Sequence, residues 1–300
     1  MITVLRPLST SQLLDRTFHL YRNHFLTFVG ITAIPQLFIL ALLLAGAVLR
    51  LGRQENTSFA LTAAGYLLFY LAVFISQAPT IAAVSNLHME RPATLSSAFS
   101  SSRRALLRVI WIVFVMFVIM FTLVSLAALL FALLTGAAST FAGPAVGGTA
   151  GAAVLGIAAF LGLRWVLNWS LIIPVTVLEG GGFWRSAHRS KDLARGTRGR
   201  IFTVFALMTI FAFVVGLMIQ FLLLLVVPFL RLRDAHAVEA AVQGMQAVGV
   251  FASTSLVGAL ATIALSLIYY DQRVRKEGYD LQLMMTVLEG RTSNAAAPAS

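Results

Sequence analysis

The longest uncharged stretch of this chain runs from Val109 to Leu163, 55 residues without Asp, Glu, Lys, Arg or His. It is more than twice the roughly 20 residues that an α-helix needs to cross the hydrocarbon core of a bilayer. The stretch therefore has to fold back on itself inside the membrane. We expect the turn at Thr135–Gly148, where glycine, proline and small polar residues collect.

Other long apolar runs complete the set of predicted membrane spans. Of the 300 residues, 59% are hydrophobic and 11% are charged, against about a quarter charged in soluble domains. An unpaired backbone amide is costly in lipid, and continuous apolar runs exclude the alternating pattern of a barrel. We predict an all-α polytopic integral membrane protein with one domain over residues 1–290 and six transmembrane helices, at about 25–49, 60–87, 106–134, 149–178, 201–230 and 248–270.

The distribution of basic residues sets the expected orientation. With six spans, the N-terminus, the loops 88–105 and 179–200 and the C-terminus share one side. That side carries 17 of the 22 lysines and arginines when Arg108 is counted with its loop. The positive-inside rule places it in the cytoplasm, so both termini are expected to be cytoplasmic. Residues 291–300 are expected to form a disordered tail.

Three basic, serine-containing stretches precede apolar hairpins. They read STSQLLDRTFHLYR, LSSAFSSSRRALLR and FWRSAHRSKDLAR, and their closing L-x-R triplets are 86 and 87 residues apart. If the first stretch is helical, Leu13, Thr17 and Tyr21 lie on one face and charged residues lie on the other. This is the pattern of an interfacial helix. We predict three repeats of a cytoplasmic interfacial amphipathic helix and a transmembrane hairpin. The alternative is that these loops are basic only because they are cytoplasmic.

Three blocks of sequence carry a resemblance to a known family. They are LRPLSTSQLLDRTFHLYRNHFLTFVGITAIP (5–35), IIPVTVLEGGGFWRSAHRSKDLARGTRGRIF (172–202) and IYYDQRVRKEGYDLQL (268–283). In this order they resemble the bacterial multi-pass family named for the membrane domain of glycerophosphoryl diester phosphodiesterases. The resemblance implies a stand-alone membrane domain in a bacterial cytoplasmic (inner) membrane. It does not extend to the catalytic domain, because no soluble α/β segment is left.

Catalytic and cofactor motifs are missing from the sequence. H-E-x-x-H, G-x-S-x-G and G-x-x-x-x-G-K-[ST] are absent, the five histidines are scattered, and there is no cysteine. We predict no enzymatic activity, no cofactor and no metal site. Nucleic acid is not an expected partner either, because the basic stretch 185–200 is flanked by spans and no folded domain presents a groove-reading element.

Basic residues of the cytoplasmic stretches are the candidate contacts to anionic lipid headgroups, to which each contributes about 1 kcal/mol near an anionic surface. The candidates are Arg22, Arg108, Arg185, Arg189 and Arg195. Gly180-Gly181-Gly182 is interpreted as a flexible joint. The alternative is a phosphate cradle that Arg185 and Arg189, one turn apart, face together. A protein partner or a homo-oligomer is left open.

Polar residues inside the spans are the second candidate site. Arg164 and Asn168 are one turn apart, and a charge in hydrocarbon costs about 2.5–3.5 kcal/mol on insertion scales. Arg164 either snorkels to the outer headgroups, or it lines a polar path with Asn168, Gln77 and Gln220. The first interpretation fits a non-catalytic membrane protein that engages anionic lipid or a membrane partner. The second fits the alternative function, a transporter or channel for a small molecule or lipid.

Small residues and prolines predict local packing. Gly147 and Gly151 form a G-x-x-x-G pair that lets helix backbones approach closely. Pro79, Pro174 and Pro228 are expected to end helices near the ends of spans.

Overall fold

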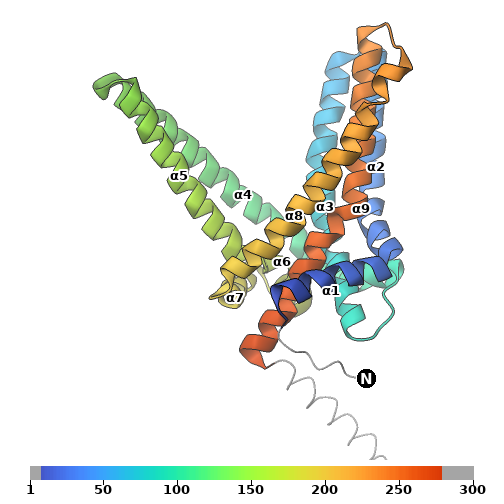
Figure 1. The fold of residues 1–300 in the computed structure, drawn as a ribbon, viewed down its shortest axis with the longest axis vertical. Helices are drawn as coiled ribbons and strands as arrows, with labels where there is room; N and C mark the ends of the chain where they lie inside the picture. The colour runs from blue at the N-terminus through green and yellow to red at the C-terminus, as the bar shows by residue number, and fades with distance from the viewer. Residues whose placement is uncertain (1–7, 279–300) are drawn as a thin grey trace, which may run out of the picture. The chain divides into compact units, whose positions relative to one another are not determined.

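The computed structural model describes residues 8–278, and within this range the chain forms helices and no strands (Figure 1). The helices are α1 (Thr10–Asn23), α2 (Phe25–Leu51), α3 (Glu55–His88), α4 (Leu95–Ala142), α5 (Pro144–Trp169), α6 (Ile172–Glu179), α7 (Phe183–Ala194), α8 (Arg198–Leu224), the 3-10 helix η1 (Val227–Leu230) and α9 (Ala235–Glu277).

Six helical segments are long and apolar enough to cross a membrane. They are Phe25–Leu51, Glu55–His88, Leu95–Ala142, Pro144–Glu179, Arg198–Leu230 and Ala235–Glu277. Each is longer than the roughly 20 residues that the hydrocarbon core requires. By length and composition, the predicted all-α protein with six spans is confirmed for the described residues.

Helix α4 is much longer than the predicted span 106–134. It begins at Leu95 because Thr94 and Ser97 cap it reciprocally, with Thr94 N donating to Ser97 Oγ at 2.9 Å and Ser97 N donating to Thr94 Oγ1 at 3.2 Å. The stretch LSSAFSSSRRALLR is therefore the first part of α4. The prediction of a separate interfacial helix is wrong for this second copy, and the order of elements differs among the three proposed repeats.

The predicted turn at 135–148 is far shorter than expected. Only Gly143, at φ +92°, separates α4 from α5. This backbone conformation suits glycine because it has no Cβ.

Helix α9 also exceeds its predicted span and begins at Ala235 rather than Val248.

The fourth span is interrupted at Ser170–Leu171. Pro174 has no N–H to donate to the Ser170 carbonyl, and its ring crowds that oxygen. Ser190 of α7 pairs two other backbone groups at the break, since its hydroxyl donates to Asn168 O at 2.8 Å and accepts from Leu171 N at 3.2 Å. Pro174 therefore breaks this span instead of ending it. Pro79 likewise does not end a helix, because α3 continues to His88.

The contacts divide the chain into two compact units, where the sequence predicts one domain. Unit 1 comprises residues 1–102 and 199–300, and unit 2 comprises residues 103–198. In unit 1, α2, α3 and α9 lie side by side (Figure 1). Their shared core contains Ile39, Leu43, Ala72 and Ala247.

Polar side chains tie these three apolar helices together. Thr32 of α2 donates to the Ser255 carbonyl of α9 at 2.8 Å, and Ser58 of α3 donates to the Gly46 carbonyl of α2 at 2.8 Å. Interhelical hydrogen bonds of this kind favour association of spans in lipid, where apolar contact alone gives little driving force.

Two ion pairs mark opposite ends of unit 1. Arg50 of α2 lies 3.3 Å from Glu239, and Arg200 of α8 lies 2.7 Å from Asp271. Along α9 these two acids are about 48 Å apart at 1.5 Å per residue, which exceeds the roughly 30 Å hydrocarbon core. Both ion pairs can therefore lie outside the core. Leu8, the start of α8 and the end of α9 meet at the Asp271 end, so they share one side.

In unit 2, α4 and α5 form an antiparallel hairpin (Figure 1). A Cβ on Gly147 would lie 2.9 Å from the Thr135 carbonyl, and one on Gly151 would lie 2.7 Å from Phe131 Cε2. The G-x-x-x-G pair thus marks a close approach of the two helices, as predicted. The close approach does not extend to Gly156, where a Cβ would meet nothing within 4 Å.

Candidate functional site

Helix α7 of unit 2 has a buried face and an exposed face. The buried residues are Phe183, Ser186, Ala187, Ser190, Leu193 and Ala194. Between them lie exposed Trp184, Arg185, His188 and Lys191 and one exposed acid, Asp192. The Trp184 side chain is 72% exposed. One face of α7 therefore packs on the protein, and the other presents an aromatic ring beside basic groups.

Two of the candidate arginines hold the joint that precedes α7. Gly180 ends α6 in the left-handed conformation at φ +72°. Arg108 of α4 donates from Nη1 to the Gly180 carbonyl at 3.0 Å. Arg189 of α7 donates from Nε to both carboxylate oxygens of Glu179, at 3.1 and 3.2 Å. Arg108 and Arg189 thus meet at Glu179–Gly180, where they bind protein oxygens.

The other three candidate arginines are exposed. Arg185 lies in the first turn of α7, and Arg195 is the residue that caps its C-terminus. Arg22 lies in the last turn of α1, in unit 1.

Helix α1 is fixed to unit 1 at both ends. Ser9 and Gln12 form a capping box at its start, and Leu13 and Thr17 are buried. Near its end the Tyr21 hydroxyl donates to the Leu256 carbonyl of α9. Burial raises the pKa of Tyr21 to about 12, so this hydroxyl stays protonated and remains a donor at physiological pH.

The four residues of the predicted intramembrane polar path lie on three helices. Arg164, which is exposed, and Asn168 lie on α5 of unit 2, whereas Gln77 lies on α3 and Gln220 on α8 of unit 1. Gln220 packs against α9, because a Cβ on Gly249 would fall 2.2 Å from Gln220 Oε1. Within residues 8–278, no hydrogen bond joins any two of the four.

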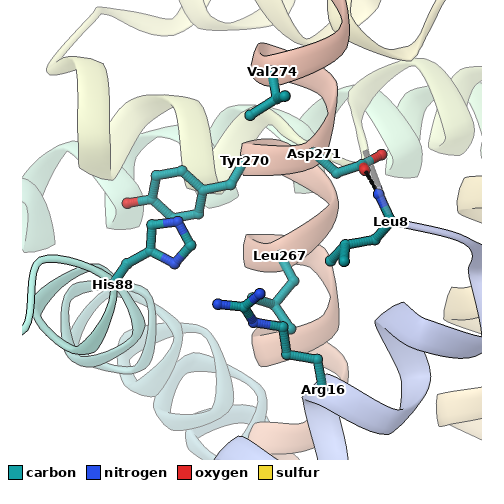
Figure 2. A pocket seen from close by; sticks show the side chains of 7 residues that line it. All are labelled: Leu8, Arg16, His88, Leu267, Tyr270, Asp271 and Val274. Atoms are coloured by element: carbon teal, nitrogen blue, oxygen red, sulfur yellow. Dashed lines mark hydrogen bonds between the residues drawn. The ribbon is translucent and has the colours of Figure 1, made fainter. Parts of the chain in front are cut away.

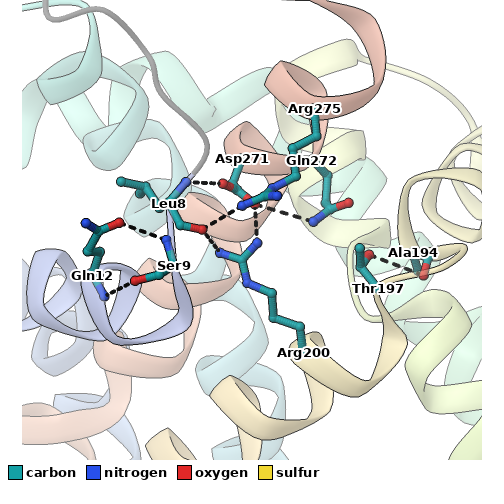
Figure 3. A network of polar contacts seen from close by, with 9 residues as sticks. All are labelled: Leu8, Ser9, Gln12, Ala194, Thr197, Arg200, Asp271, Gln272 and Arg275. Carbon is teal, nitrogen blue, oxygen red and sulfur yellow. Dashed lines mark hydrogen bonds and ion pairs between the residues drawn. The ribbon is translucent and has the colours of Figure 1, made fainter.

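A buried carboxylate in unit 1 is the centre of a network that sequence reasoning did not find. Asp271, with a side chain 1% exposed, accepts from Leu8 N on Oδ1 at 2.8 Å (Figure 3). Its Oδ2 accepts from Arg200 Nη1 at 2.7 Å and from Arg275 Nε at 2.9 Å. The Nη2 groups of both arginines also donate to the Leu8 carbonyl, at 2.6 and 2.7 Å. Two guanidinium groups thus clamp one peptide unit and one carboxylate.

A small pocket adjoins this network (Figure 2). Its volume is about 20 Å³, and it is lined by Leu8, Arg16, His88, Leu267, Tyr270, Asp271 and Val274. This volume admits about one water molecule. The His88 ring stacks on Tyr270 with ring centroids 4.5 Å apart. Over residues 8–278, no group of three or more His, Asp or Glu side chains is placed to hold a metal ion.

The Asp271 network had a weak signal in the sequence. Asp271 is the first charged residue after the last uncharged run, and arginines follow at 273 and 275. Its partners Leu8 and Arg200 are distant in sequence, and no pattern links them.

No known family model, no curated protein and no solved structure matches this chain.

Proposed function

We propose that this chain is a non-catalytic integral membrane protein that binds anionic lipid headgroups through basic residues on its cytoplasmic side. The observation that carries the proposal is the exposed face of α7, where Trp184 stands beside Arg185, His188 and Lys191. Tryptophan favours the membrane–water interface, and basic groups there attract anionic lipid. Helix α1 adds exposed Phe18 and Arg22 in the same role.

The proposal includes a location and a family. We place the protein in a bacterial cytoplasmic membrane with both termini in the cytoplasm, on the strength of the 17 basic residues assigned to that side. The three sequence blocks at 5–35, 172–202 and 268–283 support membership of the family named above. The basic interfacial helices are α1 and α7.

Native mass spectrometry tests the lipid assignment. The purified protein is presented with equal amounts of phosphatidylglycerol and phosphatidylcholine, and the retained lipids are counted. Lys191→Gln with Arg195→Gln removes two charges from α7. Arg231→Gln with Arg233→Gln removes two exposed charges from the opposite predicted side and serves as the matched control. We expect the α7 variant alone to lose preference for phosphatidylglycerol. Equal retention by both variants and the unmodified protein contradicts the proposal.

Labelling of single cysteines tests the orientation. The chain has no cysteine, so one introduced at exposed Ser100 or exposed Thr57 reports its own side without background. In intact cells, we expect a membrane-impermeant maleimide to reach Thr57→Cys and not Ser100→Cys. The reverse pattern refutes the cytoplasmic assignment.

Transport is not part of the proposal. Its candidate path is divided between the two units, since Arg164 and Asn168 lie on α5 of unit 2 and Gln77 and Gln220 lie on α3 and α8 of unit 1.

A further inference from the structure

We infer that the glycine joint Gly180–Gly182, together with the first turn of α7, binds a phosphate group. This inference rests on the proposed function and names the part of the headgroup that is recognised. The site lies within unit 2, where the membrane span Pro144–Glu179 ends and α7 begins.

The start of α7 presents free amide groups. Gly182 is its N-cap in an extended conformation, and no side chain caps the helix. The first hydrogen bond of the helix runs from Ser186 N to the Gly182 carbonyl at 2.9 Å. The amides of residues 183–185 precede it, so no carbonyl of α7 accepts from them. These amides and the positive end of the helix dipole favour an anion.

A buried hydroxyl without a partner points to a ligand at the same place. Ser186 is 0% exposed, and its Oγ has no hydrogen-bond partner. This oxygen would lie 3.1 Å from a Cβ on Gly181, so it is directed at the joint. The absent Cβ of Gly181 is what leaves space beside the hydroxyl. A phosphate oxygen there would accept from Ser186, satisfying a group that otherwise stays unpaired.

The charges around the joint favour an anion. The aliphatic stem of Arg185 lies over Gly181, with Cδ 3.4 Å and Cγ 3.5 Å from the position of a Cβ, and the residue is exposed. Arg108 reaches the joint through its bond to the Gly180 carbonyl. Glu179, which adjoins the joint in sequence, is paired with Arg189. Arg185 and Arg108 therefore lie at a joint whose adjacent carboxylate is already neutralised.

The ligand is a phosphate, either in a lipid headgroup or free in solution. Exposed Trp184 next to the joint is suited to the headgroup region, which favours the lipid as its source. Both sources present the same oxygens to the amides and to Ser186, and the experiment separates them.

The experiment measures phosphate binding to the full-length protein through the thermal midpoint of unit 2. All four tryptophans, at 111, 165, 169 and 184, lie in unit 2, so tryptophan fluorescence, excited at a wavelength that tyrosine does not absorb, reports this unit alone. The protein in zwitterionic detergent is titrated with inorganic phosphate in one arm and with short-chain phosphatidylglycerol in the other. Binding to the folded state raises the midpoint with ligand concentration.

Two variants remove parts of the site, and each has a matched control in unit 2. Ser186→Ala removes the hydroxyl, and Gly181→Ala fills the space beside it. Ser139→Ala removes a hydroxyl that bonds locally to the Gly136 carbonyl, and Gly148→Ala adds a Cβ that meets nothing within 4 Å. We expect Ser186→Ala to weaken phosphatidylglycerol binding about tenfold, the loss of one hydrogen bond to a charged group, and Gly181→Ala to weaken it because the added Cβ blocks the approach to that hydroxyl. The controls should bind as the unmodified protein does.

Ser186→Ala also separates a ligand-binding role from a structural one. Without ligand, removal of an unpaired buried hydroxyl should leave the midpoint unchanged or raise it. With ligand, the rise in midpoint should shrink. A response to the lipid alone identifies a headgroup site, and a response to inorganic phosphate alone identifies a site for free phosphate.

The inference is overturned if Ser186→Ala binds both ligands as tightly as the unmodified protein, or if neither ligand shifts the midpoint. The outcome for Lys191→Gln with Arg195→Gln is independent of this result, since neither residue belongs to the joint. Failure of the phosphate site therefore leaves the proposed lipid-binding function to its own test.

Discussion

Asp271→Ala is the substitution for which we expect the largest loss of stability in unit 1. The carboxylate is buried and accepts hydrogen bonds from Leu8 N, Arg200 and Arg275 at 2.7–2.9 Å and a longer one from Gln272 Nε2 at 3.5 Å. Its removal leaves two guanidinium groups facing one another and an unpaired backbone amide. Both consequences act at the place where the N-terminal segment, α8 and α9 meet.

The expected magnitude follows from the burial of the three charged groups. Removal of one partner from a buried ion pair costs about 3–5 kcal/mol. The Arg200 and Arg275 side chains are 17% and 37% exposed, so water partly solvates them once the acid is gone. We therefore expect the lower end of that range, about 3 kcal/mol. At about 2 °C per kcal/mol for a chain of this size, the thermal midpoint of unit 1 falls by about 6 °C.

A thiol-reactive fluorogenic dye measures this midpoint unit by unit, because the natural chain has no cysteine. Ala264→Cys places a buried thiol in α9 of unit 1, and Ala187→Cys places one in α7 of unit 2. We expect Asp271→Ala to lower the midpoint reported from position 264 by about 6 °C, worked from the burial argument above.

The matched control removes another acid from α9. Glu239 pairs with Arg50, but its side chain is 57% exposed. Exposed ion pairs contribute about 0.2–1 kcal/mol, so Glu239→Ala should lower the midpoint by about 1 °C. If Asp271→Ala lowers the unit 1 midpoint no further than Glu239→Ala does, the network does not stabilise unit 1 and the reasoning is wrong.

Two further substitutions test single contacts. Ser190→Ala should destabilise unit 2 by about 1–3 kcal/mol, because the hydroxyl forms hydrogen bonds on both sides of the break in the fourth span. Tryptophan fluorescence measures the thermal midpoint of unit 2. A midpoint equal to that of Ser139→Ala contradicts this prediction. Gly249→Ala should displace the Gln220 amide, the flexible end of that side chain, from α9 and destabilise unit 1 by about 1 kcal/mol, the low end for overpacking. The control is Gly244→Ala, because a Cβ there would have its nearest neighbour at 3.9 Å. If the thiol at position 264 reports the same thermal midpoint for both glycine variants, the packing argument is wrong.

The sequence predicts the membrane spans well and the ends of the helices poorly. Hydropathy reports where apolar side chains stop, but helical hydrogen bonding continues wherever the next residues tolerate it. The segment AHAVEAAVQGMQA is rich in alanine and other helix formers, so α9 begins at Ala235 although the apolar run begins at Val248. The same reasoning explains why α4 starts at Leu95, as soon as a cap is available.

The break in the fourth span depends on a contact that no local pattern contains. Pro174 by itself fits either the end of a helix or a kink inside one. What decides between them is Ser190, which lies 16 residues later and supplies a donor and an acceptor to the freed backbone. A pattern search within one helix cannot find this pairing.

The arginines of the predicted cytoplasmic side differ in what they contact, which changes how their number should be interpreted. Arg108, Arg189, Arg200 and Arg275 donate to protein oxygens. A guanidinium that is already bound to a carbonyl or carboxylate has fewer donors left for a headgroup. Under the lipid-binding proposal, the count of 17 basic residues therefore overstates the charge that lipid can reach, although the predicted orientation still rests on this count. In the lipid-binding proposal, the contacts are expected from exposed basic groups on α1 and α7, Lys191 among them.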